Sequence, residues 1–467
     1  MSFFSAEVLR SITNGRWRQR PETPLTPVGL GTDTRADLSG RAFLALRGER
    51  YDANEHLAEA VAAGAVMLIA DRGEVPVPAG VPCLEVDDGR LALGRIARAH
   101  RRTLESTRVI AITGSCGKTT TKRLIHSVLR RALAGTAAPR SFNNDVGVPL
   151  SILAASPDDQ YLVLEIGTNA PGEVATLASI AEASVAVVTG IGPAHLAGFG
   201  SVEAIAREKG ALLAHLPADG LAVVNAASHE LDGLLRRLNA VVRYGDDPAA
   251  DLRLTDRGRD AEGWWFEVNG RRRYRIGLPG RHNAINALAA IAVGRRLGLD
   301  EDDIAAGLAA ADAPPMRMTH VRVAGLDLYN DAYNANPRSM EAALETFLEL
   351  AETATRRVLI LGDMGELGDA ADEHHRALGR RLAGEADRLD RIVLIGALAP
   401  QIGVGIAAAG RRIPVTHHAT LDAATRVSIR RDLRPGDAVL LKASRSLALE
   451  RLAEDLADHG LAAAAAV

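Results

Sequence analysis

The chain has 467 residues, and its composition of 47% hydrophobic and 24% charged residues is ordinary for a globular protein of two to four domains. Its net charge of -3 gives no broad basic surface, so we expect no nucleic-acid partner. The two cysteines, Cys83 and Cys116, are too few for a disulfide framework or a cysteine-rich zinc site, which favours a reducing cytoplasm. The longest apolar run, residues 61–70, is too short to span a bilayer, so we expect a cytoplasmic protein without membrane insertion.

In chain order, the first predicted element is a short amphipathic helix with Ser5 as its N-cap and Gly15 after its end. After it, short apolar runs rich in β-branched residues alternate with helical patterns. Each run is bounded by glycine or polar residues, which favours parallel strands buried between layers of helices. The runs are residues 66–72, 108–114, 161–167, 184–192, 221–226, 357–364, 391–397 and 438–444. Residues 263–280 differ, because Asn269-Gly270 between two alternating runs predicts an antiparallel hairpin.

Two segments divide this α/β chain into three predicted domains. Residues 101–107 separate a first α/β unit from the strand that follows them. Residues 311–318 contain a Pro-Pro pair, which neither a helix interior nor a central strand tolerates. We therefore expect domains at residues 1–104, 105–313 and 314–467. No extra interface element is visible in the sequence, so we expect a monomer.

The stretch RVIAITGSCGKTTTKRLIHSVLRR predicts a buried strand, a turn of small residues and a helix. In the turn, Gly114 and Gly117 allow successive backbone N–H groups to face an anion, and the helix directs its positive end to the same place. Lys118 is placed to reach the outer phosphates of a nucleotide, and the hydroxyl of Thr119 to bind Mg²⁺. The usual spacing places the first glycine of such a turn two positions earlier. We therefore expect a variant phosphate loop that binds a nucleoside triphosphate.

Three residues further along the chain extend this site. Glu165 ends a predicted strand, where a carboxylate can bind Mg²⁺. His195 lies in the loop after the next strand, and Lys209 lies on a predicted helix. Taken alone, His195 is typical of a loop histidine bonded to backbone, and Lys209 of a surface lysine. An ammonium group does not bind a metal, so Lys209 would do so only when modified, for example as a carbamate formed with CO₂.

Taken in order, these motifs resemble those of the Mur ligase family, over about residues 32–451. The resemblance implies an N-terminal α/β domain that binds a UDP-linked substrate, a central ATP-binding domain with a phosphate loop, and a Rossmann-like C-terminal domain. It implies ATP and Mg²⁺ as cofactors. It also implies that the γ-phosphate passes to a substrate carboxylate, and that an amine then attacks the acyl phosphate.

The resemblance also implies roles for individual residues. The catalytic residues are Lys118, Glu165, His195 and Lys209. The metal ligands are Thr119, Glu165, His195 and, if carbamylated, Lys209. The ATP-binding residues are Thr113, Gly114, Ser115, Cys116, Gly117, Lys118, Thr119, Thr120, Asn283, Asn286, Arg317 and Asp331. The substrate-binding residues are Thr34, Arg35, Asn143, Asn144, Tyr333, Asn334, Asn336 and Ser339.

The segment DAYNANPRS, residues 331–339, distinguishes between members of the family. It is similar to the pattern of the member that adds D-alanyl-D-alanine to UDP-N-acetylmuramoyl-tripeptide, and so are residues 359–379. The Asp-Asn-Pro-Arg marker of the member that adds a diamino acid is absent. The resemblance therefore implies these two small molecules as the partners and a UDP-linked pentapeptide as the product. Whether the third peptide residue is lysine or diaminopimelate stays open.

Several positions depart from the family pattern. Ala53 and Asn54 replace a Gly-His pair, Ala170 stands where a histidine is usual, and Ala211 replaces a frequent glutamate. The core catalytic groups are not among these positions. We therefore expect the departures to change substrate contacts rather than the reaction.

Three other interpretations stay open at this point. The first is a related ligase that adds another amino acid, or glutamate to a folate. The folate enzyme would begin directly with the ATP-binding domain, and the α/β unit before residue 101 argues against that case. A nucleotide-dependent switch would bind a partner and form no product. An inactive family member would be expected to lack groups such as Lys118, Thr119 or Glu165, which are present.

Overall fold

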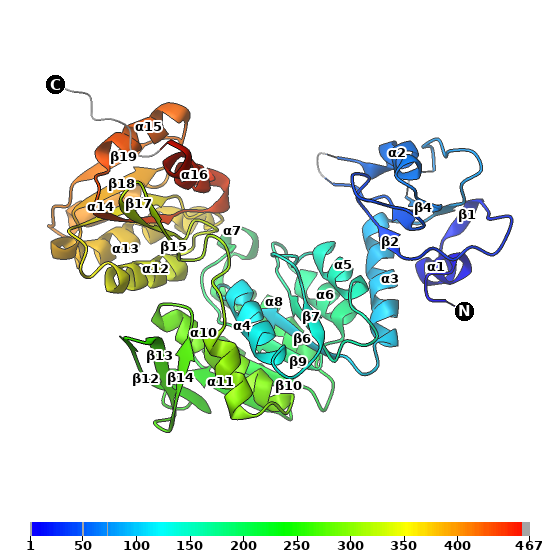
Figure 1. Cartoon of the computed structure of the whole chain (residues 1–467), viewed down its shortest axis with the longest axis horizontal. Coiled ribbons are helices and arrows are strands. Elements are labelled where there is room, and N and C mark those ends of the chain that lie inside the picture. Colours follow the sequence, from blue (N-terminus) through cyan, green and yellow to red (C-terminus); the bar gives the residue numbers. More distant parts are fainter. Residues whose placement is uncertain (1, 49–50, 72, 460–467) are drawn as a thin grey trace.

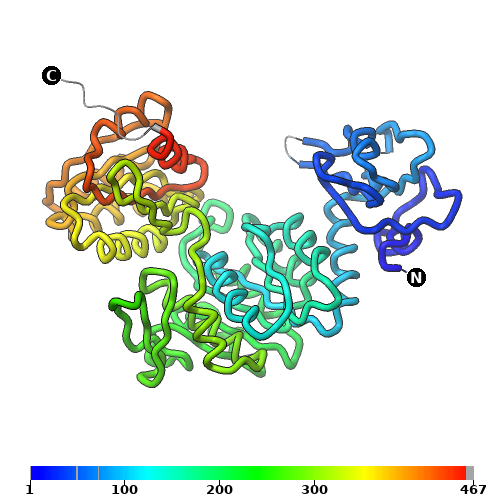
Figure 2. Tube along the Cα trace, viewed as in Figure 1, coloured from blue at the N-terminus to red at the C-terminus, as the bar shows by residue number. Residues whose placement is uncertain are grey.

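The computed structural model describes residues 2–48, 51–71 and 73–459, and these ranges hold three β-sheets, each with its own helices. We call the three units the N-terminal, central and C-terminal bodies. The N-terminal and C-terminal bodies lie at opposite ends of the longest axis, with the central body between them (Figure 1). The chain passes from each body to the next without returning (Figure 2). Residue 72, at the end of one predicted strand, lies outside the described residues.

The N-terminal body is built on a five-stranded sheet in the order β1-β5-β4-β3-β2, in which only β1 is antiparallel to its neighbour. Its strands are β1 (Arg16–Gln19), β2 (Leu30–Gly31), β3 (Ala42–Leu44), β4 (Met67–Ala70) and β5 (Cys83–Glu85). Its helices are α1 (Ala6–Thr13), η1 (Ala53–His56), α2 (Leu57–Ala62) and α3 (Gly89–Thr103). The helix α1 begins after Ser5 as predicted, although the Ser5 side chain makes no capping hydrogen bond. The long helix α3 contacts α1 and also helices of the central body, so it joins the two bodies.

The central body holds a nine-stranded sheet in the order β14-β13-β12-β11-β10-β9-β6-β8-β7. Its strands are β6 (Arg108–Thr113), β7 (Gly135–Ala137), β8 (Tyr161–Glu165), β9 (Val185–Val188), β10 (Leu221–Asn225), β11 (Val241–Gly245), β12 (Leu252–Asp260), β13 (Gly263–Val268) and β14 (Arg272–Ile276). Its helices are α4 (Lys118–Leu129), α5 (Gly147–Leu153), α6 (Glu173–Ala181), α7 (Leu196–Phe199), α8 (Val202–Ala214), η2 (His229–Leu231), α9 (Asp232–Leu235), α10 (Arg281–Arg296) and α11 (Glu301–Ala309). The strands from β7 to β12 pair in parallel, and β12, β13 and β14 form an antiparallel ribbon. The predicted hairpin at Asn269-Gly270 is therefore confirmed.

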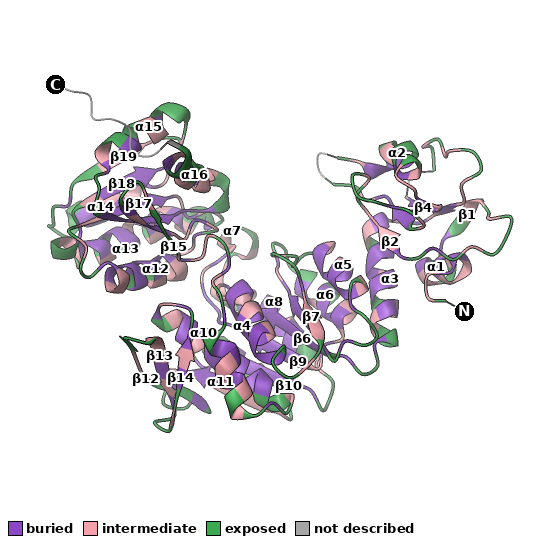
Figure 3. Ribbon diagram, in the orientation of Figure 1, coloured by how far each residue is buried: buried purple, intermediate pink, exposed green. Residues whose placement is uncertain are grey.

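Helices cover both faces of the central sheet because its strands are apolar on both sides. Along β6, Ile110 and Ile112 join the core beneath α4 and α10. Val109 and Ala111 join the core beneath α5, α6 and α8. Successive side chains of a strand point to opposite faces of the sheet, so a continuous apolar run needs to be covered on both faces. The buried strands lie inside the layers of helices in Figure 3.

The C-terminal body has a six-stranded sheet in the order β15-β16-β20-β17-β18-β19, which is parallel except for its edge strand β15. Its strands are β15 (Thr319–Val323), β16 (Leu326–Asn330), β17 (Arg356–Gly362), β18 (Arg391–Ile395), β19 (Val415–His418) and β20 (Asp437–Lys442). Its helices are α12 (Pro337–Leu350), η3 (Gly368–Ala370), α13 (Ala371–Ala383), η4 (Ala386–Arg388), α14 (Pro400–Ala408), α15 (Ala423–Asp432), η5 (Arg445–Leu447) and α16 (Glu450–His459). In the described part of the chain, no helix is both long and apolar enough to cross a membrane.

Candidate active site

A cavity of about 1000 Å³ lies where the central body meets the C-terminal body, and we call it the main cavity. It brings together most of the residues that the sequence predicted for the site. Those that line it are Ser115, Cys116, Gly117, Lys118, Thr119, Thr120, Asn143, Asn144, Glu165, His195, Asn283, Asn286, Arg317, Asp331, Tyr333, Asn334, Asn336 and Ser339. The lining does not include Thr34, Arg35, Thr113, Gly114 or Lys209.

The phosphate loop connects β6 to α4 and turns at two glycines, Gly114 with φ 146° and Gly117 with φ 81°. Glycine alone adopts such angles without strain. A Cβ atom on Gly114 would lie 2.0 Å from Oγ1 of Thr189, so no side chain fits there. Gly117 leaves the first turn of α4 without a side-chain cap, which keeps its N–H groups available to an anion. The Nζ of Lys118 donates to the carbonyl oxygen of Gly114 at 2.7 Å, and burial lowers the pKa of this lysine.

The loop between β9 and α7 supports the phosphate loop. The backbone N–H of Ser115 donates to the carbonyl oxygen of Gly190, and its hydroxyl donates to that of Gly192, both at 2.9 Å. From the C-terminal body, the guanidinium of Arg338 donates to the carbonyl oxygen of Ile191 at 2.6 Å. This one loop therefore contacts both the phosphate loop and α12. Arg338 was not predicted as a site residue, because its partner is a backbone atom of a segment distant in the sequence.

The carboxylate of Glu165, at the end of β8, lies close to three donor groups. Its Oε2 accepts from the hydroxyl of Thr119 at 3.0 Å and lies 3.4 Å from Nζ of Lys122, and its Oε1 accepts from Nδ2 of Asn143 at 3.0 Å. The adjacent hydroxyl and carboxylate oxygens fit Mg²⁺, which is usually held by one or two carboxylates and by substrate phosphates. No three His, Cys, Asp or Glu side chains gather as a metal site within the described ranges. These residues therefore fit a metal that is bound together with a nucleotide rather than by the protein alone.

His195 is held by a carboxylate from the other body. Its Nδ1 lies 2.5 Å from Oε2 of Glu366, and the backbone N–H of Ala197 donates to the carbonyl oxygen of Glu366 at 3.1 Å. His195 and Glu366 have φ angles of 58° and 62°, which are uncommon for residues other than glycine. The hydrogen bond with His195 lowers the pKa of Glu366. Such a bond fixes the orientation of an imidazole ring and leaves Nε2 as its free nitrogen.

Lys209 lies on α8 and is 1% exposed. Burial, reinforced by the charge of Lys118, lowers its pKa to about 7. Its neighbour Glu208 accepts hydrogen bonds from the backbone N–H groups of Gly172 and Val174, at 2.7 and 2.8 Å. The expectation that Lys209, taken alone, is a surface residue is therefore wrong. Much of this amine is neutral near pH 7, which is the form that reacts with CO₂.

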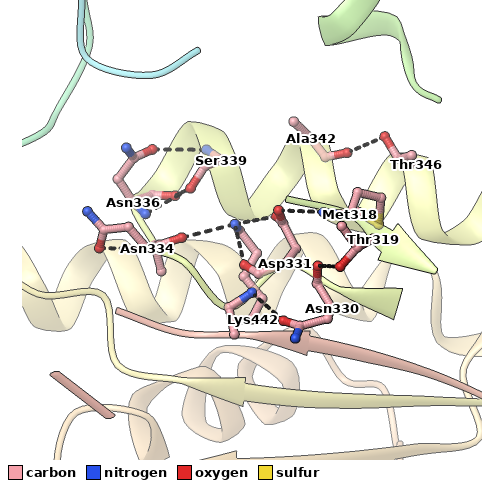
Figure 4. A network of polar contacts seen from close by, with 12 residues as sticks. Met318, Thr319, Asn330, Asp331, Asn334, Asn336, Ser339, Ala342, Thr346 and Lys442 are labelled. Carbon is pink, nitrogen blue, oxygen red and sulfur yellow. Dashed lines mark hydrogen bonds and ion pairs between the residues drawn. The ribbon is translucent and has the colours of Figure 1, made fainter. Parts of the chain in front are cut away.

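The segment after β16 forms the wall of the main cavity on the C-terminal side (Figure 4). Asp331 forms an ion pair with Lys442 at 2.5 Å, and Lys442 also donates to the carbonyl oxygen of Asn334 at 3.1 Å. Asn336 is the N-cap of α12 and forms a reciprocal capping box with Ser339. The side chains of Asn336 and Ser339 thus have a structural role here, and their assignment to a substrate stays a prediction.

Contacts from this wall also reach the phosphate loop. The Nδ2 of Asn336 donates to the carbonyl oxygen of Ser115 at 3.5 Å. The guanidinium of Arg317 lies 4.3 Å from the ring centre of Tyr333 and donates to the hydroxyl of Thr119 at 3.4 Å. The two bodies are therefore in direct contact around the phosphate loop.

Asn283 and Asn286 lie on the first turns of α10, next to the phosphate loop. Asn283 donates through Nδ2 to the carbonyl oxygen of Pro279 at 2.7 Å, and its Oδ1 accepts from Asn286 at 3.5 Å. Burial lowers the pKa of the adjacent His282 to about 4. This side of the cavity is thus polar and uncharged, as expected for contacts with a base or ribose.

The N-terminal body places Thr34 and Arg35 in the segment between β2 and β3. Arg35 is exposed, and its guanidinium donates two hydrogen bonds to Asp33, at 2.9 and 2.7 Å. Nearby, Asn54 is fully buried and exchanges hydrogen bonds with Asp71, at 2.8 and 3.2 Å. One of the departures from the family pattern is thus a buried residue with hydrogen-bond partners.

Family profiles match the parts of the chain that form this site. The Mur ligase middle domain matches residues 112–294, and the Mur ligase glutamate ligase domain matches residues 316–445. UDP-N-acetylmuramoyl-tripeptide–D-alanyl-D-alanine ligase of Bacillus subtilis (strain 168) is 34% identical over 93% of this chain and 94% of its own length. The chain belongs to the Mur ligase family.

Solved structures of Mur ligases have the same fold. A crystal structure of MurF from Acinetobacter baumannii superimposes with a TM-score of 0.86 at 33% identity, over 97% of this chain and 99% of that one. A crystal structure of MurF ligase from Thermotoga maritima in complex with ADP has a TM-score of 0.79 at 27% identity, covering 91% and 96%. The chain is thus an ATP-dependent, amide-bond-forming Mur ligase with the expected α/β fold, and the likeness extends through the N-terminal body.

Proposed function

We propose that this Mur ligase joins D-alanyl-D-alanine to UDP-N-acetylmuramoyl-tripeptide in the cytoplasm and forms UDP-N-acetylmuramoyl-pentapeptide, ADP and phosphate. The observation that carries the proposal is one cavity lined by both the phosphate loop and residues 331–339. The Bacillus subtilis relative is named for this reaction and matches nearly the whole chain. The ADP in the Thermotoga maritima structure supports ATP as the nucleotide.

In the first step, the terminal carboxylate of the tripeptide attacks the γ-phosphorus of ATP and forms an acyl phosphate, and ADP leaves. Lys118, beside the uncapped start of α4, stabilises charge on the transferring phosphoryl group. Thr119 and Glu165 would hold Mg²⁺, which supplies further charge neutralisation when bound. The nucleophile is the substrate carboxylate, so the protein needs to provide none.

In the second step, the amine of the dipeptide attacks the acyl carbon, and phosphate leaves from the tetrahedral intermediate. His195 faces this part of the cavity in the orientation that Glu366 imposes. We assign a second metal ion to His195 and, if it is carbamylated, Lys209; these residues would hold the ion beside the reacting end of the substrate, where it would supply further charge neutralisation. The low pKa of Lys209, about 7, supports a neutral amine that can form a carbamate near neutral pH.

The UDP end of the substrate is assigned to the N-terminal body, with Thr34 and Arg35 as its contacts. Binding energy from this remote group would hold the peptide end in the main cavity, where it reacts. We propose that residues 1–104, 105–313 and 314–467 act as the three domains and that the enzyme works as a monomer. The second candidate, a nucleotide-dependent switch, has no specific observation in its favour.

The test is phosphate release from ATP and Mg²⁺ with each substrate alone and with both together. The tripeptide is supplied in its lysine and diaminopimelate forms, and the mass of the product is measured by mass spectrometry. We expect release only when both substrates are present, with a UDP-linked pentapeptide as product, and the preferred tripeptide then identifies the third residue. Release that is indifferent to both substrates would contradict the proposal.

A further inference from the structure

A second cavity, of about 790 Å³, lies along α4 beside the main cavity. Its cationic lining residues are Lys122, Arg123, Arg130, Arg140, Arg317 and Arg445, and we call it the arginine cavity. Thr119, Ser141, Pro314, Arg317 and Tyr333 line both cavities. The shared wall therefore lies at the start of α4, where the outer phosphates of a nucleotide are expected.

The arginine cavity carries a large excess of positive charge. Asp312 is the single carboxylate among its described lining residues. Two of the cations have partners outside the lining, since Lys122 lies 3.4 Å from Glu165 and Arg445 lies 2.6 Å from Glu450. Lys122 also donates to the carbonyl oxygen of Arg140.

The other four cations are arginines without a carboxylate partner among the described residues. One of them, Arg317, donates to the hydroxyl of Thr119 at 3.4 Å. Arg123 donates only to the carbonyl oxygen of Ala313, at 3.2 Å. The guanidinium groups of Arg130 and Arg140 make no hydrogen bond or ion pair within the described ranges. Many other arginines of this chain are paired, such as Arg95 with a carboxylate at 2.7 Å. Guanidinium groups left unpaired around a concave surface attract anions, and their planar donors match carboxylate and phosphate oxygens.

The state of His126 agrees with a positive potential in this cavity. Its Nδ1 lies 3.0 Å from the hydroxyl of Tyr161. Burial lowers the pKa of His126, and the charges of Arg130, Arg123 and Lys122 lower it further. The positive charges around this cavity thus disfavour a further proton on His126.

We propose that the arginine cavity is an oxyanion-binding site of the ligase reaction. The inference rests on the proposed function, which supplies two oxyanions next to the shared wall. One is the free carboxylate of the incoming dipeptide, and the other is the phosphate that leaves. An extended dipeptide spans about 7 Å, so an amine near Thr119 would place its carboxylate beside Arg123, roughly one helical turn further along α4.

The site itself is tested by calorimetric titration of the full chain with inorganic phosphate, in the presence of saturating ADP to occupy the phosphate loop. The test variant is Arg123→Gln/Arg140→Gln, and the control is Arg131→Gln, an exposed arginine that does not line the cavity. We expect the Kd for phosphate to rise about tenfold or more in the double variant, because charged hydrogen bonds are lost, and to stay unchanged in the control. Equal phosphate binding by all three proteins would overturn the proposal. If the double variant melts at a lower temperature, Arg140→Gln alone replaces it.

The source of the oxyanion is decided by initial rates with D-alanyl-D-alanine and with its C-terminal amide. If the site takes the dipeptide, the wild type has a KM about tenfold higher for the amide, and the double variant has equal KM values for both. If it takes the released phosphate, both KM values stay unchanged and the inhibition constant for phosphate rises. A wild type that forms no pentapeptide would refute the proposed function instead. The calorimetric titration would still test whether the arginine cavity binds an oxyanion.

Discussion

The phosphate loop and the contact between His195 and Glu366 border the same cavity, but they are built in different ways. The loop is one continuous stretch whose path follows from Gly114, Gly117 and the start of α4. The contact joins the central body to the C-terminal body through one ion pair and one backbone hydrogen bond. The conformation of the part that binds the nucleotide therefore depends on neighbouring residues in the sequence. The geometry of the part expected to contact the acyl group depends on how the central and C-terminal bodies pack against each other. The following predictions test this difference.

The largest effect is expected at the phosphate loop, from Lys118→Ala. Removing the amine beside the phosphate loop takes away a charge that stabilises the transferring phosphoryl group, so turnover should fall about 10³-fold. Phosphate release in the presence of both substrates measures this loss. Arg108→Ala, at the exposed start of β6, is the control and should keep the wild-type rate. A Lys118→Ala enzyme that retains a tenth of the activity would contradict the role given to this residue.

Glu366→Ala removes the contact with His195 and leaves the phosphate loop and the other contacts between the two bodies intact. Turnover should fall about 10²-fold because His195 loses the partner that orients it, as is typical of such supporting residues. The KM for ATP should change little. Glu366→Gln keeps an acceptor for Nδ1 of His195 and should recover most of the activity. Equal loss in the alanine and glutamine variants would show that the carboxylate does more than orient the ring.

The pKa of Lys209, about 7, predicts that bicarbonate stimulates the enzyme in a pH-dependent way. Below this pKa the amine is protonated and cannot form a carbamate, and above it the amine is neutral. The neutral fraction rises from about a tenth at pH 6 to about nine tenths at pH 8, so the stimulation should grow roughly tenfold over that interval. Rates in CO₂-free buffer, with and without added bicarbonate, measure it. Stimulation that is flat with pH would argue against a carbamate at this position.

The smallest effect concerns a contact between the bodies outside the cavity. Arg257, on β12, donates to both carboxylate oxygens of Glu349, on α12, at 3.1 and 2.7 Å. Both side chains are about a third exposed, so the pair should contribute about 1 kcal/mol or less. We expect Arg257→Ala to raise the KM for ATP less than about fivefold, and the difference to vanish in 0.5 M salt. A much larger effect would show that this pair contributes more to holding the two bodies together than a partly exposed ion pair should.

The eight predicted strands and the hairpin are confirmed, because the signals on which they rest are local. All eight apolar runs contain strands, and Asn269-Gly270 forms the expected turn. Other strands were not predicted, among them the antiparallel edge strands β1 and β15, because the four residues of β1 (RWRQ) include none that is buried and β15 has exposed residues at its centre. Their pairing is determined by the neighbouring strand rather than by their own pattern.

In the candidate site, too, local patterns predict some residues, and tertiary packing alone places the others. The spacing of glycine, lysine and threonine predicts the phosphate loop, and the carboxylate at the end of β8 is predicted by its position alone. The burial of Lys209, in contrast, follows from the packing of α8 against the central sheet. Glu366, which contacts His195, and Arg338, which contacts the loop that supports the phosphate loop, belong to the C-terminal body. No short-range sequence pattern links them to these partners.

The sequence by itself determined the order of elements, the conformation of the phosphate loop and the family, because hydrophobic periodicity, glycine angles and residue spacing act over a few neighbouring residues. The tertiary structure decided which side chains meet across the two cavities. It placed Glu366 on His195, buried Lys209 enough to lower its pKa to about 7, and left Arg123, Arg130 and Arg140 around one cavity without a carboxylate partner. Such contacts depend on how whole sheets and helices pack, and desolvation and unpaired charge arise only once that packing is complete.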